Sequence, residues 1–309
     1  MNPRLLVLVG PTASGKTAFA CELAERLGAE IVSADSQQCY RGLDAGTAKP
    51  TAPERERAPH HLLDVVDPEE QLDARRFVEL ADAAIGDLAR RAKRAIVAGG
   101  TGLWIRALLR GLVEAPGASA EFRAGFRREL EREGVAALHA RLERVDPDAA
   151  RAIGTNDRVR IERALEVHAL SGRRLSDLQR EHAFAEERYP ARVISLDPPR
   201  ELLHDRIARR TRTLFESGAL ERETRWLLDR CERVPAARKA LKIIGYGEVA
   251  AALAGRSTRE EAEARVAART RQYAKRQRTW FGKEYGPASE WPPDAARLCA
   301  DGARWYDGG

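Results

Sequence analysis

Short apolar runs alternate with longer amphipathic runs in much of the chain. The apolar runs are too short and too uniformly apolar for surface helices, which is typical of strands buried in a parallel sheet. We expect such strands at residues 5–9, 30–35, 61–66, 95–98 and 192–196. Runs with helical spacing lie between them, at residues 17–27, 73–91 and 102–109. This alternation predicts an α/β fold with a doubly wound parallel sheet.

The pattern changes between residues 115 and 190, where no strand signal occurs. Apolar residues recur at helical spacing over 122–130 and again over 138–145, and Asn156-Asp157 predicts the cap of a further helix that ends near Gly172. We therefore expect an inserted, all-helical subdomain. The expected division is a core domain of residues 1–114 and 191–309 and an insertion of residues 115–190.

One loop between an expected strand and an expected helix reads G-x-x-x-x-G-K-T, which is the pattern of a phosphate-binding loop, or P-loop. Glycines at both ends let successive backbone N–H groups point into one concavity, and the following helix adds its positive N-terminus. The lysine supplies a mobile ammonium, and the final threonine hydroxyl suits Mg²⁺. We expect diphosphate or triphosphate contacts from Gly10, Pro11, Thr12, Ala13, Ser14, Gly15, Lys16 and Thr17.

Other polar residues follow strands of the same expected sheet, where ligands of such sheets bind. Asp35 ends the second strand, and its carboxylate could hold magnesium or act as a general base. Thr101 lies in a Gly-Gly-Thr-Gly turn, where its hydroxyl could orient a substrate or cap the next helix. His60 and His61 have no carboxylate or cysteine at ligand spacing, so we expect structural roles for both.

The charge of the chain is informative mainly through its distribution. The net charge is +6 for 309 residues, a modest excess. Seven basic residues and no acidic one occur between Arg265 and Lys283. Arg271, Lys275 and Arg278 would share a helix face there, which predicts contacts with nucleic-acid phosphates, although a solvated charged face would give the same pattern.

The remaining composition excludes several classes of protein. The four cysteines are scattered without metal-ligand spacing, which favours reduced thiols and a cytoplasmic location. Apolar runs are far shorter than a membrane span, so no membrane association is expected. The loop follows the first residues so closely that no signal peptide fits.

Several strings of residues resemble the tRNA dimethylallyltransferase family, also called tRNA isopentenyltransferases. The strings lie at residues 10–17, 33–38, 40–42, 46–50, 59–62, 99–102, 156–157, 160–161, 163–166, 245–246 and 269–277. The resemblance spans about residues 5–283, and the strings at 46–50 and 269–277 are far more specific than the loop. No two-Cys, two-His segment follows the core, and in this respect the chain resembles bacterial members of the family.

The resemblance implies a reaction as well as a fold. The family transfers a dimethylallyl group from dimethylallyl diphosphate to the exocyclic amine of an adenosine. That adenosine lies 3′ of the anticodon in tRNAs that read codons beginning with U. The implied ligand of the loop is then a prenyl diphosphate, although the motif alone would predict ATP binding. The implied cofactor is Mg²⁺, the partner is the tRNA anticodon stem-loop, and we expect a monomer.

Residue roles follow from the same resemblance. Asp35 would accept the amine proton, and Thr101 would touch the adenine after it leaves the RNA stack. Lys16 and Arg210 would neutralise the leaving diphosphate, with Arg206 as the alternative arginine. The other implied tRNA contacts are Ser36, Gln37, Gln38, Arg123, Val159, Arg160, Ile161, Glu162, Arg163, Lys242, Gly245 and Tyr246.

Three other functions remain open on sequence grounds. An adenylate isopentenyltransferase shares the opening motifs but modifies free nucleotides, so it needs neither a helical insertion nor a basic helix. A P-loop kinase of a small metabolite would use the same loop. A non-catalytic RNA-binding NTPase would not need Asp35 beside that loop. Gly247 also departs from the family, which often has a basic residue there.

Overall fold

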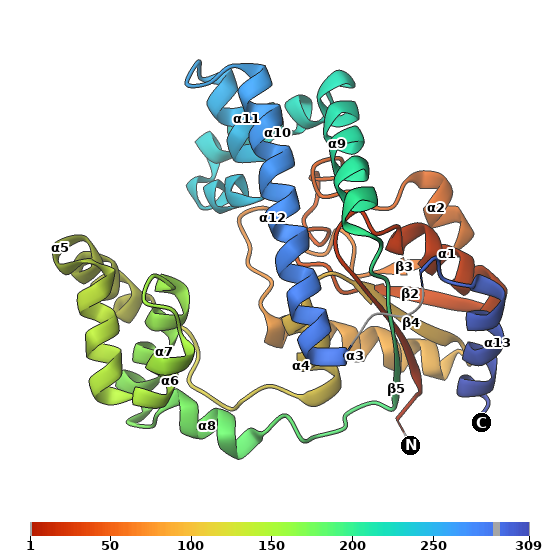
Figure 1. The fold of residues 1–309 in the computed structure, drawn as a ribbon, viewed down its shortest axis with the longest axis horizontal. Coiled ribbons are helices and arrows are strands. Elements are labelled where there is room, and N and C mark those ends of the chain that lie inside the picture. The colour runs from red at the N-terminus through yellow and green to blue at the C-terminus, as the bar shows by residue number, and fades with distance from the viewer. Residues whose placement is uncertain (1, 287–290, 309) are drawn as a thin grey trace. The chain divides into compact units, whose positions relative to one another are not determined.

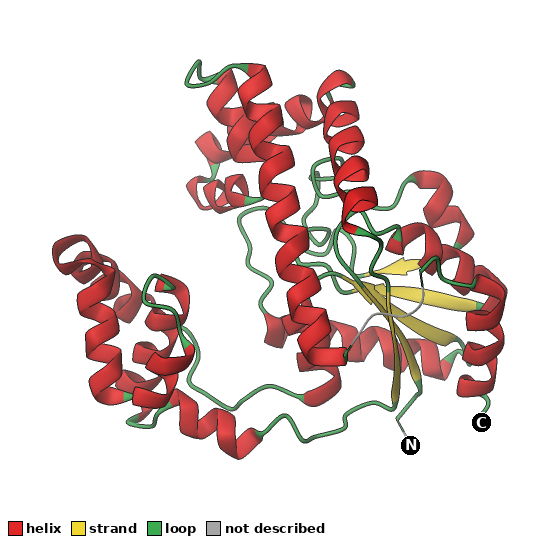
Figure 2. Cartoon of the chain, in the orientation of Figure 1, coloured by secondary structure: helices red, strands yellow, loops and turns green. Residues whose placement is uncertain are grey.

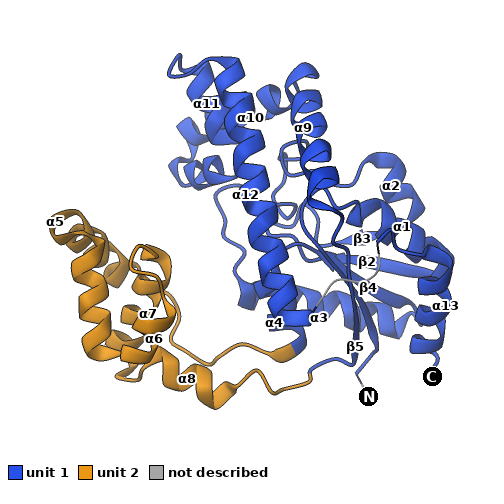
Figure 3. Ribbon diagram, viewed as in Figure 1, with its two compact units in different colours: residues 1–109, 188–309 blue, residues 110–187 orange. Residues whose placement is uncertain are grey.

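The structure is a computed structural model, and it describes residues 2–286 and 291–308 (Figure 1). The chain divides into two compact units (Figure 3). Unit 1 comprises residues 1–109 and 188–309, and unit 2 comprises residues 110–187. The expected division lay at 114/115 and 190/191, a few residues from these boundaries.

Unit 1 is built on a five-stranded sheet in which every strand pair is parallel. Its strand order is β3-β2-β4-β1-β5. The strands are β1 (Leu5–Val9), β2 (Ala29–Ser33), β3 (His60–His61), β4 (Arg94–Gly99) and β5 (Ala191–Ser195). All five residues of β1 are buried, as its uniform apolar pattern predicts. The α/β fold with a parallel sheet is therefore confirmed.

The third strand is shorter than predicted. The sequence favoured residues 61–66, whereas β3 contains only His60 and His61. Leu62 and Asp64 have positive φ angles of 67° and 55°, so the chain turns away from the extended conformation there. Val66 rejoins the structure only through an isolated bridge to Tyr40.

Helices cover both faces of the sheet (Figure 2). Alternate residues of β1 belong to different cores: Leu6 and Leu8 pack with α1 (Lys16–Leu27) and α13 (Ala295–Tyr306). Leu5, Val7 and Val9 pack with α3 (Ala74–Arg90) and α4 (Gly102–Arg110). The short helix α2 (Ala52–Arg57) begins at a capping box made by Thr51 and Glu54.

The rest of unit 1 is helical and extends beyond the carboxyl ends of the strands (Figure 1). It contains α9 (Arg200–Glu216), α10 (Ala219–Arg233), the 3₁₀ helix η1 (Pro235–Lys242), α11 (Tyr246–Leu253) and α12 (Arg259–Tyr285). Leu220, Leu227, Tyr246 and Val266 form part of a separate buried core within this region. One end of α12, including Phe281, packs into the core of the sheet. The long helix therefore joins this helical core to the core on one face of the sheet.

Unit 2 contains α5 (Ala120–Val145), α6 (Pro147–Ala152), α7 (Arg158–Ser171) and α8 (Leu175–His182). Gly134 has φ 80° and interrupts α5, so the two apolar series predicted for 122–130 and 138–145 lie on separate helical segments. Asp157 caps α7 by accepting the Arg160 N–H, and Gly172 ends that helix in the left-handed conformation, as predicted.

No helix in the part of the chain that the structure describes is both long enough and apolar enough to cross a membrane.

Candidate active site

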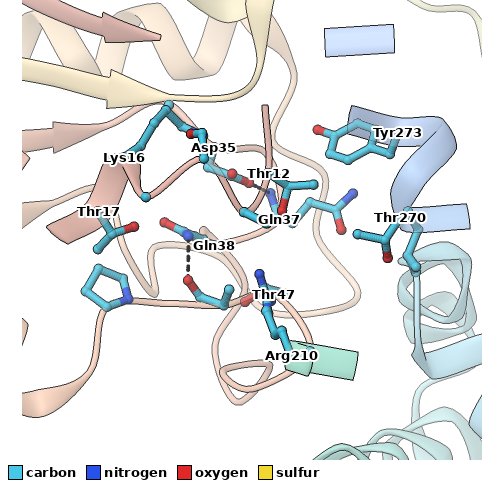
Figure 4. Close-up of a pocket in the computed structure, with 18 of the residues that line it drawn as sticks. Thr12, Lys16, Thr17, Asp35, Gln37, Gln38, Thr47, Arg210, Thr270 and Tyr273 are labelled. Atoms are coloured by element: carbon cyan, nitrogen blue, oxygen red, sulfur yellow. Dashed lines mark hydrogen bonds between the residues drawn. The ribbon is translucent and has the colours of Figure 1, made fainter. Parts of the chain in front are cut away.

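A cavity of about 280 Å³ lies in unit 1 where β1 and β2 end (Figure 4). Lys16, Asp35 and Arg210 all line it, together with Tyr273. These residues come from the start of α1, the end of β2, α9 and α12, so four distant parts of the sequence meet here. Pockets for small-molecule ligands usually measure roughly 300–1,000 Å³, and this volume lies just below that range, which suits a small substrate.

The loop of residues 10–17 bends at its two glycines. Gly10 has φ 153°, and a Cβ there would lie 2.4 Å from the Leu196 carbonyl oxygen. Gly15 has φ 93°, a backbone conformation that side chains disfavour. The predicted bends are thus observed. Thr12 to Thr17 line the cavity, whereas Gly10 and Pro11 line a second, smaller one beside Leu196.

The Lys16 ammonium is held inside the loop. Its Nζ donates a hydrogen bond of 2.9 Å to the Pro11 carbonyl. Burial lowers the pKa of Lys16 to about 8; the Asp35 carboxylate opposes this shift and the Arg210 guanidinium adds to it. At mildly alkaline pH, part of the Lys16 population is therefore neutral without a ligand and would gain a proton when an anion binds.

The structure separates the two candidate arginines of α9. Arg206 donates from Nη1 to the carbonyls of Ser14 (3.0 Å) and Ala13 (3.4 Å), so it supports the loop from its outer side. Arg210 lines the cavity instead. Burial lowers the pKa of Arg210, and the nearby Asp35 carboxylate opposes that effect. Arg210 is therefore the arginine placed to meet an anionic ligand.

Ser36, which follows Asp35 in the chain, connects this segment to Thr101 through hydrogen bonds. The Asp35 carboxylate accepts the Gln37 N–H at 2.9 Å. The Thr101 hydroxyl accepts the Ser36 N–H at 2.9 Å and donates to the Ser36 hydroxyl at 3.2 Å. The Thr101 side chain therefore holds the segment after β2 in place. Gln38 does the same for the next loop, donating to the Ala48 carbonyl at 2.8 Å.

Tyr246 and Gly245, both expected as tRNA contacts, are buried beside the loop of residues 44–46. Tyr246 is 0% exposed and donates its hydroxyl to Glu223 at 2.6 Å. Glu223 also accepts the N–H groups of residues 44–46. A Cβ on Gly46 would lie 2.5 Å from the Tyr246 ring. Burial leaves the Tyr246 side chain no surface for contact with RNA in this structure, whereas Gly245 lines the cavity.

Packing also explains why a lysine stands at position 49 and a glycine at position 247. The Lys49 side chain is 1% exposed and donates to the Tyr40 carbonyl and to Asp44 and Asp64. It therefore ties together the loop of residues 40–50. A Cβ on Gly247 would lie 2.6 Å from the Leu241 carbonyl oxygen, so a basic side chain does not fit there without a backbone shift. Lys242, close by, is exposed.

In unit 2, the expected tRNA residues fall into two groups. Ile161 is 0% exposed and belongs to the core, so its expected contact with RNA is wrong for this conformation. Arg123 and Arg163 both pair with Glu166, whose side chain is fully buried, at 2.9 Å each. Their first role is to neutralise that carboxylate. Val159 and Arg160 are exposed, and Glu162 is half-buried.

The basic face of α12 is less uniform than predicted. Lys275 is exposed, and Arg271 is half-buried. Arg278 forms an ion pair with Asp197 at 2.5 Å, so its charge is largely compensated. The structure thus leaves Lys275 as the clearest candidate for a phosphate contact on this face.

Four residues of α12 line the cavity, and none of them was predicted as a site residue: Val266, Thr270, Tyr273 and Gln277. Tyr273 faces the cavity near Thr270 (Figure 4). Gln277 lines the same cavity and is 5% exposed. Both belong to the string 269–277 and are four residues apart, so they share a helix face. That spacing was the signal that could have identified them.

Protein groups alone do not form a metal cage in the described part of the chain, where no cluster of three or more His, Cys, Asp or Glu side chains occurs. The Thr17 hydroxyl and the Asp35 carboxylate nevertheless line the cavity. Magnesium is commonly held by few protein oxygens together with substrate phosphates, so this donor set fits such an ion.

The fold and the cavity define a class: an α/β protein with a small-molecule site at the carboxyl edge of a parallel sheet. Residues 38–284 match the model of the IPP transferase family. The chain belongs to this family.

Individual relatives agree with that assignment. The chain is 56% identical over 290 residues to a protein of Anaeromyxobacter dehalogenans named tRNA dimethylallyltransferase, covering 94% of this chain and 95% of the relative. A protein of Myxococcus xanthus with the same name is 49% identical over 96% of this chain and 95% of its own length.

Solved structures are similar as well. The full-length tRNA isopentenylpyrophosphate transferase of Bacillus halodurans superposes with a TM-score of 0.69 at 35% identity, covering 99% of this chain and 97% of its own. A eukaryotic dimethylallyltransferase acting on tRNA superposes with a TM-score of 0.82 at 26% identity, covering 99% and 80%.

Proposed function

We propose that this protein transfers the dimethylallyl group of dimethylallyl diphosphate to the exocyclic amine of an adenosine in tRNA. The adenosine would be the one 3′ of the anticodon in tRNAs that read codons beginning with U. The observation that carries the proposal is the meeting of Lys16, Asp35 and Arg210 in one cavity. The family and its relatives favour a tRNA acceptor over a free adenylate or a kinase substrate.

The lining of the cavity has a polar part and an apolar part, which suit the diphosphate and the hydrocarbon of a prenyl diphosphate. Loop residues 12–17 and Arg210 supply N–H groups and positive charge for the diphosphate. Apolar residues from three helices and from the segment between η1 and α11 provide a surface for the hydrocarbon. They include Ile207, Leu214, Leu220, Ile244 and Val266. We therefore interpret the loop as a P-loop that binds the leaving group of an alkyl transfer.

The chemistry requires a base on one side and charge neutralisation on the other. The amine nitrogen bonds to the allylic carbon as the bond from that carbon to the diphosphate oxygen breaks. Asp35 accepts the amine proton, because its carboxylate lines the cavity near Lys16. Lys16 and Arg210 stabilise the negative charge that develops on the leaving diphosphate. Magnesium held by Thr17 and the diphosphate would supply further positive charge.

The tRNA side of the proposal rests on fewer residues than the sequence suggested. Within unit 1 it uses Ser36, Gln37 and Gln38 near Asp35 and the exposed Lys275 of α12. Within unit 2 it uses the exposed Val159 and Arg160 at the start of α7. The adenine must leave the RNA stack to reach a recessed carboxylate, as in other enzymes that modify bases. We propose that unit 2 is the inserted tRNA-binding subdomain.

The acceptor can be identified directly. The protein is incubated with magnesium, dimethylallyl diphosphate labelled in its hydrocarbon, and unmodified tRNA or AMP in separate reactions. Label in tRNA, recovered on the adenosine 3′ of the anticodon after nuclease digestion, supports the proposal. Label in AMP alone would identify the protein as an adenylate isopentenyltransferase. Phosphoryl transfer from ATP with no label transferred would indicate a kinase.

A further inference from the structure

Gln277 connects two parts of the site that are far apart in sequence. Its Oε1 accepts the Thr12 N–H at 2.8 Å, and its Nε2 donates to the Gly100 carbonyl at 2.9 Å. Thr12 belongs to the loop of residues 10–17, and Gly100 belongs to the turn that follows β4. The side chain is 5% exposed, so these bonds form away from solvent and both partners depend on them.

The turn at Gly100 is in turn fixed to the segment that carries Asp35. The Thr101 N–H donates to the Ala34 carbonyl at 3.2 Å, and the Thr101 hydroxyl accepts the Ser36 N–H at 2.9 Å. A Cβ on Gly100 would lie 2.3 Å from Nε2 of Gln277 and 3.8 Å from Oδ2 of Asp35. Gly100 thus lies between the amide and the carboxylate, and there is no room there for a side chain.

We propose that Gln277 is a positioning residue that sets the distance between the loop and the Asp35 carboxylate, an inference that rests on the prenyl transfer proposed above. One primary amide spans both halves because it can accept from one backbone group and donate to another. Both polar atoms of its side chain are bonded to backbone groups, so it acts through the loop and the turn. Its effect is to hold the diphosphate and the base in register while the allylic carbon passes from the diphosphate to the amine.

The test compares Gln277→Ala and Gln277→Glu with Gln272→Glu. Gln272 lies on the same helix but is exposed, so its variant controls for added negative charge. Gln277→Ala removes both bonds and should lower kcat about 10²-fold, the usual cost of a small misplacement of reacting groups, with KM for tRNA unchanged. Gln272→Glu should keep the wild-type kcat. Thermal unfolding of each variant shows that the compared proteins are folded.

Gln277→Glu gives a readout that a purely structural role would not move. A neutral carboxyl can still accept from Thr12 and donate to Gly100, whereas a carboxylate cannot donate. Burial raises the pKa of such a carboxyl, with Asp35 acting in the same direction and Lys16 and Arg210 opposing. The ratio of variant to wild-type kcat should therefore rise as the pH falls. Tyr273, which lines the same cavity, is present in both proteins, so any effect of its ionisation on kcat cancels in this ratio.

The outcomes separate this inference from the proposed function. A wild-type kcat for Gln277→Ala would overturn the inference that Gln277 bridges the loop and the Asp35 side of the site. The same conclusion would follow if the ratio of variant to wild-type kcat were equal for Gln277→Glu and Gln277→Ala at every pH. If the wild-type protein transfers nothing to tRNA, the proposed function fails, and binding of magnesium diphosphate decides the bridge. Gln277→Ala should then weaken that binding about tenfold, as for one lost hydrogen bond, and unchanged binding would contradict the bridge alone.

Discussion

Lys16 should make diphosphate binding depend on pH in the mildly alkaline range. Its pKa is lowered to about 8, so about half of the lysines carry charge at pH 8 and about one-tenth at pH 9. A bound diphosphate stabilises the ammonium and raises its pKa, so the charged form binds and the neutral form does not. The dissociation constant should then increase about tenfold between pH 7 and pH 9.

The measurement is a calorimetric titration with magnesium diphosphate at several pH values. Titration of the ligand itself is removed by comparison with Lys16→Arg, whose guanidinium stays charged throughout. The ratio of wild-type to variant dissociation constants should rise about tenfold over the two pH units. Near pH 8.5, buffers of different ionisation enthalpy should reveal proton uptake on binding by the wild type only.

A flat ratio would refute this reasoning. It would mean that Lys16 is already fully charged without ligand, or that its ammonium does not contact the diphosphate. Proton uptake by both proteins would assign the titration to another group. Either result would contradict the pH dependence assigned to Lys16.

Three further predictions follow from other parts of unit 1. Asp35→Asn should lower turnover by roughly two to four orders of magnitude, as for loss of a general base, while filter binding shows tRNA affinity unchanged; a collapse of affinity would make Asp35 a recognition residue. Glu223→Ala should lower the free energy of unfolding by about 3 kcal/mol in denaturant titrations, because backbone N–H groups of residues 44–46 and the Tyr246 hydroxyl lose their acceptor; a change under about 1 kcal/mol would contradict this support role. Lys275→Ala should reduce the salt dependence of tRNA binding by about one phosphate contact, and Arg278→Ala, already paired with Asp197, should reduce it less; equal slopes for both variants and the wild type would exclude phosphate contacts by these two residues.

Local features of the site could be predicted from the sequence. The bounds of β1 agree with its apolar run, and Gly10 and Gly15 adopt the conformations that the loop requires. Asp157 and Gly172 bound α7 because capping depends on neighbouring residues. These features are encoded within a few residues, so pattern and spacing suffice to find them.

Long-range packing could not be predicted in the same way. Arg206 and Arg210 share a helix face, and only the fold shows that one holds loop carbonyls and the other lines the cavity. Tyr246 belongs to a specific family string, but its burial against Gly46 depends on contacts 200 residues apart. Gln277 likewise reaches Thr12 across 265 positions of the sequence.

The central claim is that the loop binds the leaving group of an alkyl transfer and not a donor of phosphoryl groups. A donor labelled in two places tests it most directly: dimethylallyl diphosphate with ¹⁴C in the hydrocarbon and ³²P in the diphosphate. The account predicts that all ¹⁴C transferred is found in tRNA and that ³²P is released as diphosphate in equal amount. Recovery of ³²P in the acceptor, or release of diphosphate without ¹⁴C in tRNA, would contradict it.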